Sequence, residues 1–173
     1  MDVLISDTSV VIDLERSELI ERVFALPYRF VVPDALYEKE IKDYGGARLR
    51  ELGLEIRALT GAQVADAQRL RALERRISIH DSYALSLAKA EAAILLAGDK
   101  AMRRLAEAEE VRCHGVLWVF DQLEEHRIVG AAALHAGLSR IVAYPRCWLP
   151  RDAVEQRLKR YAEAGNPPEK GKA

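Results

Sequence analysis

The chain has 173 residues, of which 50% are hydrophobic and 31% are charged, with 26 basic residues against 27 acidic ones. A chain of this length and apolar content folds into one compact domain with a continuous core, which excludes a disordered protein. The net charge of −1 gives no overall attraction for nucleic acid, so a polyanion would need a local basic patch or bound metal ions.

Membrane and secreted classes are also excluded by the sequence. No apolar run approaches the roughly 18 residues that a membrane-spanning helix needs. The N-terminus has no basic residue before Arg16, which argues against a secretory signal. Cys113 and Cys147 lie far apart without a partner motif and are typical of free thiols in a reducing compartment. We therefore expect a soluble cytoplasmic protein without a disulfide framework.

Short apolar runs predict strands, and longer stretches with a helical period predict helices. The predicted strands cover residues 3–5, 29–32, 93–97 and 111–114, and residues 54–59 are a strand or an extended connection. The predicted helices cover residues 9–26, 36–44, 47–52, 61–76, 79–92, 100–109, 115–126 and 131–144, with a last amphipathic helix after Pro150. This alternation requires crossover connections and therefore predicts a mostly parallel central sheet with helices on both faces.

Two helix starts carry the spacing of a capping box, Thr60 with Gln63 and Ser78 with Asp81. The helix after the second strand has an apolar face that also contains an acid, Glu40. An acid on such a face is unusual because an unpaired carboxylate is costly to bury. Leu36, Tyr37, Ile41 and Tyr44 are the apolar and aromatic residues that we expect on that face.

Four acids are expected near the carboxyl edge of the sheet, where the working groups of parallel sheets gather. Asp7 and Asp99 follow two strands, whereas Asp81 and Glu40 lie on helices that join strands. Each aspartate also fits a helix cap when taken alone. Four carboxylates at ~5 Å would repel by about 3 kcal/mol per pair at an effective dielectric near 20. Such a cluster needs cations, and an all-oxygen ligand set suits Mg²⁺ or Mn²⁺.

Four segments of the chain together resemble the PIN-domain family, the nucleases that include the VapC toxins of bacteria. They are residues 4–10 (LISDTSV), 31–41 (VVPDALYEKEI), 80–88 (HDSYALSLA) and 94–100 (ILLAGDK). Each motif alone is weak, but four in the family's order and spacing make a fairly specific signal. The resemblance runs from the N-terminus to about Leu123.

The resemblance implies a PIN-like three-layer α/β/α fold and a set of metal ligands. Asp7, Asp81 and Asp99 match the family's three metal-binding aspartates. Glu40, followed by an aliphatic residue, matches its glutamate, with Glu38 as the second choice because the spacing from the second strand is one residue longer than usual. We expect a nuclease domain over residues 1–145 and a C-terminal extension, an amphipathic helix with a loose tail, over residues 146–173.

The activity that the resemblance implies is Mg²⁺- or Mn²⁺-dependent hydrolysis of RNA, with a role as the toxin of a type II toxin–antitoxin pair. A small antitoxin protein is then expected as a partner, and the family often forms homodimers. Lys100, Arg103 and Arg104 directly follow Asp99 and are candidate RNA contacts, although solvated helix charges are an equal interpretation. The helix before His80 carries four weaker candidates, Arg69, Arg71, Arg75 and Arg76.

One departure from the family pattern and three alternatives stay open. Ala97 stands where the family often has Ser or Thr, which puts catalytic efficiency in question. A catalytically weak PIN-like domain that acts as a nucleic-acid- or protein-binding module is the first alternative. A DNA flap nuclease is chemically close. A phosphate-accepting receiver domain fits poorly, because the sequence lacks its early acidic pair and its lysine after a late strand.

Overall fold

The computed structural model describes residues 1–5, 8–145 and 147–165. Five parallel strands form one sheet in the order β3-β2-β1-β4-β5, so the first strand is central. They are β1 (Asp2–Ile5), β2 (Arg29–Pro33), β3 (Glu55–Arg57), β4 (Ile94–Leu96) and β5 (Cys113–His114). All five lie within or beside the ranges expected from the sequence, and the parallel topology is confirmed.

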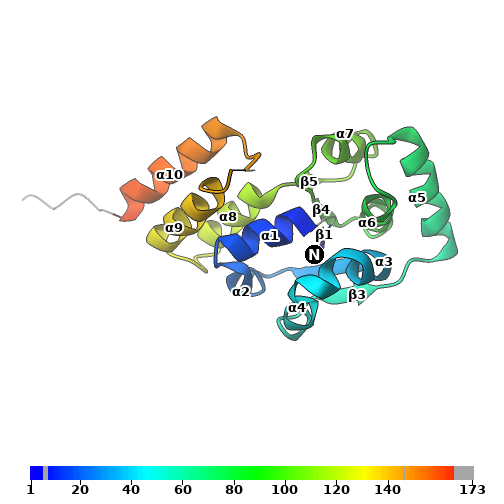
Figure 1. Cartoon of the computed structure of the whole chain (residues 1–173), viewed down its shortest axis with the longest axis horizontal. Helices are drawn as coiled ribbons and strands as arrows, with labels where there is room; N and C mark the ends of the chain where they lie inside the picture. Colours follow the sequence, from blue (N-terminus) through cyan, green and yellow to red (C-terminus); the bar gives the residue numbers. More distant parts are fainter. Residues whose placement is uncertain (6–7, 146, 166–173) are drawn as a thin grey trace, which may run out of the picture.

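Helices connect these strands and cover both faces of the sheet (Figure 1). The first half of the chain contains α1 (Thr8–Arg16), α2 (Ile20–Val23), α3 (Asp34–Leu36), the π-helical η1 (Tyr37–Gly46) and α4 (Ala47–Glu51). The second half contains α5 (Gly61–Leu73), α6 (Ile79–Ala90), α7 (Lys100–Ala108), α8 (Val116–Glu125), α9 (Ala131–Val142) and α10 (Arg151–Gly165). No helix of the described part is long and apolar enough to cross a membrane.

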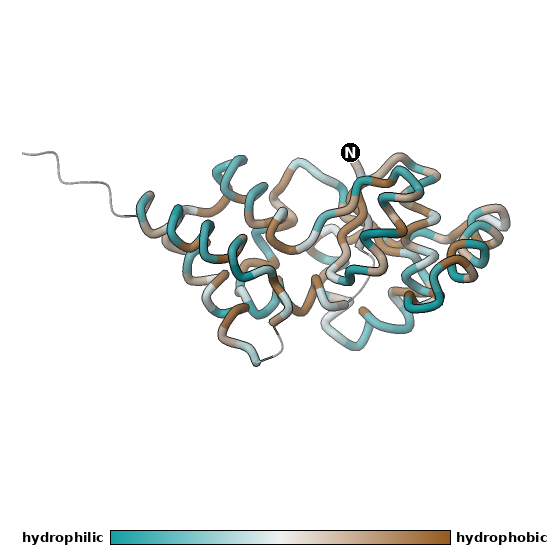
Figure 2. The backbone as a smooth tube through the Cα atoms, turned by 90° about the horizontal axis from the view of Figure 1, so that it is seen from above, coloured by the Kyte–Doolittle hydropathy of each residue, from teal (hydrophilic) through white to brown (hydrophobic). Residues whose placement is uncertain are grey.

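Two buried clusters, one on each face of the sheet, define the three layers. Phe30 and Val32 of β2 belong to the cluster under α1, α2, α8 and α9, whereas Val31 between them belongs to the cluster under α5, α6 and α7. Neighbouring residues of a strand point to opposite faces, so a central strand buried on both sides is apolar throughout. In Figure 2, hydrophobic and hydrophilic stretches alternate along the helices, as expected for helices that bury one face against the sheet.

The helix predicted over residues 9–26 is wrong as one element, because the chain forms two helices with a break between them. Glu18 has a positive φ of 60°. The buried hydroxyl of Ser17 donates to the Leu14 carbonyl at 2.6 Å and accepts the Leu19 N–H at 3.2 Å. Ser17 therefore satisfies backbone groups that a continuous helix would use, which ends α1 and starts the turn into α2.

The helix after β2 is distorted rather than regular. Tyr44 was expected on its apolar face but is 61% exposed, because Tyr44 leaves the helical region and Gly45 follows with a φ of 79°. A side chain at Gly46 would come within 2.9 Å of the Tyr37 ring. A glycine is therefore required where the chain turns back over Tyr37.

The helix predicted after Pro150 is α10, and its apolar side chains are buried within the chain. Val154 and Tyr161 join the same cluster as α8 and α9. Arg157 and Arg160 pair with Asp121 of α8, with Arg157 Nε 2.9 Å and Arg160 Nη2 3.1 Å from Asp121 Oδ1. The apolar stripe thus docks on its own domain, and a homodimer would need another surface.

The Glu109 carboxylate joins three helical segments on the other face. Arg69 of α5 donates to it through both terminal nitrogens at 2.9 and 2.8 Å, and Lys89 of α6 lies 2.5 Å away. These hydrogen bonds, that of Arg69 first, lower the pKa of Glu109 from 4.5 to about 2. The ion pairs therefore stabilise the fold fully above about pH 4.5 and lose this contribution as the pH falls toward 2.

We expect Glu109→Gln to lower the free energy of unfolding by about 1 kcal/mol at pH 7, since both cations are partly exposed and screened. Urea denaturation at several pH values measures this difference. The gap between wild type and variant should shrink below about pH 4.5. Glu107→Gln, an exposed position on α7, is the matched control and should leave the curve unchanged. A gap of constant size down to pH 3 would contradict the assignment.

Candidate metal site at the carboxyl edge of the sheet

The central strands β1 and β4 end side by side, and the candidate acid Asp99 follows β4. Ile5 pairs with Leu96 in the parallel register, and Asp99 comes three residues after Leu96. A side chain at Gly98 would meet the hydroxyl of Ser9 at 2.8 Å, so the first turn of α1 packs against the loop that carries Asp99. Asp7 lies outside the described residues, in the segment between β1 and α1.

Asp99 caps α7, which confirms the capping interpretation of this acid. Its Oδ1 accepts the backbone N–H groups of Ala101 and Met102 at 2.7 and 3.0 Å. Within the described part of the chain, its Oδ2 accepts no hydrogen bond. One oxygen therefore holds the side chain in place and the other stays available for a ligand, so capping and metal binding are compatible.

Asp81 occupies the third position of the capping box that opens α6, as the sequence predicted. Its backbone N–H donates to the Ser78 hydroxyl at 3.0 Å, and its Oδ2 accepts the Ser78 N–H at 2.9 Å. The other predicted box, Thr60 with Gln63, is also present at the start of α5. The box fixes the Asp81 side chain at the N-terminus of α6, where the helix dipole favours a negative charge.

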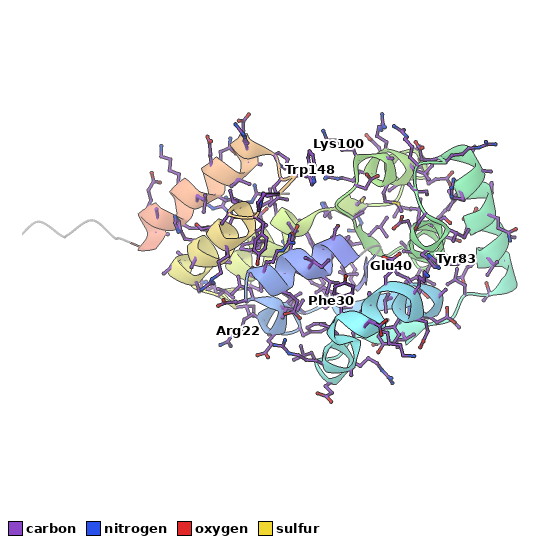
Figure 3. The ribbon with its side chains drawn as sticks, in the orientation of Figure 1. Arg22, Phe30, Glu40, Tyr83, Lys100 and Trp148 are labelled. Atoms are coloured by element: carbon purple, nitrogen blue, oxygen red, sulfur yellow. The ribbon has the colours of Figure 1, made fainter. Side chains whose placement is uncertain are left out.

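Glu40 and Glu38 point in different directions from η1. The Glu38 carboxylate is 60% exposed and pairs with Lys42 one turn on, at 2.7 Å. The Glu40 carboxylate is 28% exposed, and its Oε1 lies 3.9 Å from Nδ1 of His80, the residue before Asp81. Figure 3 shows Glu40 on η1 and Tyr83 on neighbouring α6, where Tyr83 packs edge-on against His80. Glu40 therefore lies next to the first turn of α6 and Glu38 does not.

The three basic residues after Asp99 differ in their surroundings. Lys100 and Arg104 are exposed at the start of α7. Arg103 instead folds back, and its Nη2 donates to the Gly98 carbonyl at 2.8 Å. Its Nε is buried and finds no hydrogen-bond partner among the described residues. Arg103 thus braces the loop that carries Asp99, whereas the other two face solvent.

Arg76 and Ala97 are two further residues near the loop that carries Asp99. Arg76, from the connection between α5 and α6, is held by Glu74 and lies close enough to Asp99 for that carboxylate to stabilise its charge. The sequence singled out Arg76 only weakly, and Glu74 not at all. A glutamate two residues before an arginine is the only local signal. Ala97 is fully buried in the cluster under α6 and α7.

The donor chemistry of this edge fits a hard divalent cation, although the described residues alone do not complete a ligand set. Glu40, Asp81 and Asp99 offer carboxylate oxygens, the ligands of Mg²⁺ and Mn²⁺. Over residues 1–5, 8–145 and 147–165, no three acidic, histidine or cysteine side chains gather closely enough to hold a metal ion. Asp7, the fourth proposed ligand, stands outside those ranges.

The chain folds as a five-stranded parallel α/β sandwich with a helix-capping aspartate, Asp99, after its central strand β4. A family model described as a PIN domain, DUF3368, matches residues 3–163. The chain therefore belongs to the PIN-domain family, and the match extends through most of α10, beyond the Leu123 limit of the sequence resemblance. Proteins with PIN domains are generally nucleases and typically use divalent metal ions.

One solved structure supports the fold independently. It is a PilT N-terminus domain protein, SSO1118, from the hyperthermophilic archaeon Sulfolobus solfataricus P2. The TM-score is 0.50 and the sequence identity 19%, and the alignment covers 72% of this chain and 95% of the archaeal one. At this identity the likeness concerns the fold alone. No curated protein matches the chain.

Proposed function

We propose that this protein is a Mg²⁺- or Mn²⁺-dependent endoribonuclease, with Asp7, Glu40, Asp81 and Asp99 as its metal ligands. The observation that carries the proposal is Asp99, which a cap fixes at the end of β4 with Oδ2 left without a protein partner in the described residues. Membership of the PIN-domain family supports the same chemistry. Glu40 is the preferred glutamate because it lies against the turn of Asp81.

The proposed reaction is hydrolysis of an RNA phosphodiester bond. Water adds its oxygen to phosphorus, the bond from phosphorus to the 3′ oxygen breaks, and the products carry a 5′-phosphate and a 3′-hydroxyl. A divalent cation bound to these acids supplies positive charge against the scissile phosphate and lowers the pKa of an attacking water. The chain fixes the carboxylates through its two helix starts and presents Lys100 and Arg104 to the RNA backbone.

The test is cleavage of a panel of RNA and single-stranded DNA by the purified full chain. We expect cutting of RNA with Mg²⁺ or Mn²⁺ and none with EDTA. A 5′-phosphate on the downstream product, read by sensitivity to a 5′-phosphate-dependent exonuclease, checks the bond that breaks. Cutting of DNA alone would favour the flap-nuclease alternative. No cutting of any substrate, together with absence of Mn²⁺ binding in calorimetry, would overturn the proposal.

The choice of glutamate gives a sharper expectation. Glu40→Gln should weaken Mn²⁺ binding and lower RNA cleavage by about tenfold or more, because a ligand oxygen lost at a metal site costs affinity and activity on this scale. Glu38→Gln is the matched control, two residues away on the same element, and should leave both quantities unchanged. Calorimetric Mn²⁺ titration and initial cleavage rates measure them. The reverse ranking would assign the role to Glu38.

The proposed cellular role follows from the family resemblance of the sequence motifs. The resemblance to VapC toxins favours the toxin of a type II pair, neutralised by a small antitoxin protein. Co-purification of the chain with the product of a small adjacent gene, and loss of RNA cleavage in that complex, would support it. Full cleavage by that complex would contradict it.

A further inference from the structure

Arg76 is an exposed arginine whose guanidinium is nevertheless fixed. Its Nε donates to Glu74 Oε1 at 2.8 Å and its Nη2 donates to Oε2 at 2.5 Å, a parallel two-bond contact. The Arg76 backbone N–H donates to the same carboxylate at 3.1 Å. The hydrogen bond from the Arg76 side chain is the largest cause that lowers the pKa of Glu74, to about 2, so Glu74 stays ionised at neutral pH. We call this contact between Glu74 and Arg76 the clamp.

The clamp occupies only one edge of the guanidinium. Glu74 binds the edge formed by Nε and Nη2, and Nη1 makes no hydrogen bond within the described residues. The edge formed by Nη1 and Nη2 therefore stays open, and the side chain of Arg76 is 63% exposed. An open, planar pair of donors in a fixed orientation matches two oxygens of a phosphate group.

Arg76, which carries this open edge, is near Asp99 of the candidate site. The charged form of Arg76 is stabilised first by Glu74 and further by the Asp99 carboxylate, which raises its pKa. Arg76 forms its ion pair with Glu74, and no ion pair within 4.0 Å joins it to Asp99. The charge of Arg104 of α7 also lowers the pKa of Glu74. Arg76 is thus near Asp99 but does not bind its Oδ2.

A purely structural role explains this arrangement poorly. Arg76 and Glu74 are two residues apart and join no two elements, and an exposed local ion pair contributes at most about 1 kcal/mol to stability. The neighbouring exposed arginine, Arg75, has no such clamp. Fixing a cation beside an acidic site lowers the entropy cost of binding an anion there.

We propose that Arg76 is a phosphate-binding residue of the site, and that it grips an RNA phosphate next to the scissile bond through its Nη1–Nη2 edge. This inference rests on the proposed ribonuclease function and adds a contact that selects for a charged backbone, not for a base. It assigns the connection between α5 and α6 to the RNA interface, beside the start of α7.

The test measures binding of a fluorescent single-stranded RNA to the full chain by anisotropy. The buffer contains EDTA, so that the RNA stays intact, and KCl is varied from low salt to 0.3 M. One phosphate contact on a single strand contributes about 0.7 to the slope of log affinity against log salt. Arg76→Gln should reduce the slope by about 0.7 and weaken binding about fivefold at 0.1 M salt. Arg76→Lys keeps the charge and should keep the slope.

Arg75→Gln removes the same charge one residue away and should keep both the slope and the affinity. Equal losses in the Arg75→Gln and Arg76→Gln variants would show a general charge effect and overturn the assignment of Arg76. Wild-type behaviour of Arg76→Gln would overturn it as well, while leaving the ribonuclease proposal intact. A wild-type chain that neither binds nor cuts any RNA would overturn the proposed function together with this inference.

Discussion

Asp99→Asn is expected to lower RNA cleavage by at least about a hundredfold while leaving the fold unchanged. The amide oxygen of asparagine can still accept the N–H groups of Ala101 and Met102, so the cap of α7 survives. The second oxygen, proposed as a metal ligand, is replaced by an NH₂ group that cannot bind a cation. Initial cleavage rates and thermal melting of the same preparations separate the two effects.

Asp152→Asn is the matched control, because Asp152 is an exposed aspartate in the first turn of α10, far along the chain from the sheet edge. It should retain wild-type cleavage. A growth assay extends the comparison: if the chain is a toxin, induced expression of wild type and Asp152→Asn should arrest growth, and Asp99→Asn should not. Cleavage that survives in the Asp99→Asn variant would place the chemistry elsewhere, and a fall in Tm of several degrees would show that the cap was not preserved.

Local patterns were sufficient for most of the fold. Short apolar runs located four strands and left residues 54–59, where β3 forms, as a strand or an extended connection. The capping boxes at Thr60 and Ser78 located two helix starts, because a capping box depends on residues within one turn. The helix over residues 9–26 failed at Ser17, whose buried hydroxyl bonds to backbone on both sides. Burial decides whether a serine side chain bonds to the backbone in this way, and the spacing of apolar residues along the sequence does not indicate it.

The sequence predicted the candidate site only where a residue's place depends on a strand end or a helix face. Positions two apart on a helix lie about 200° around its axis, so Glu38 and Glu40 should point apart, and the ion pair of Glu38 with Lys42 agrees with this. The contact of Glu40 with His80 and the approach of Arg76 to Asp99 join segments that are distant along the chain. Such contacts depend on how helices pack on the sheet, which sequence spacing alone does not determine.

The expected division of the chain into residues 1–145 and 146–173 places α10 in the C-terminal extension, and the packing of α10 bears on that division. Tyr161 is fully buried in the cluster that contains α8 and α9, although it lies in the proposed extension. Burial raises the pKa of its hydroxyl to about 12. Figure 1 shows α10 lying along α9 at one end of the molecule. This packing makes α10 a structural part of the α8–α9 face.

Tyr161→Ala is therefore expected to lower the free energy of unfolding by about 3 kcal/mol or more, since it leaves a cavity the size of an aromatic ring. For a chain of this size the loss corresponds to a fall in Tm of about 10 °C. Tyr161→Phe should stay within about 1 kcal/mol of wild type, because it keeps the ring and the buried hydroxyl has no hydrogen-bond partner in the described residues. Differential scanning calorimetry of the full chain measures all three proteins.

Trp148→Ala is the control for loss of an aromatic side chain without loss of packing. Trp148 is 90% exposed and projects from the connection between α9 and α10 (Figure 3). Its removal should leave Tm within about 2 °C of wild type, as for surface substitutions in general. An equally small effect of Tyr161→Ala would mean that α10 is a detachable extension, as the boundary at residue 145 supposes. A large effect confined to Tyr161→Ala would place α10 inside the cooperative unit that also carries the candidate site.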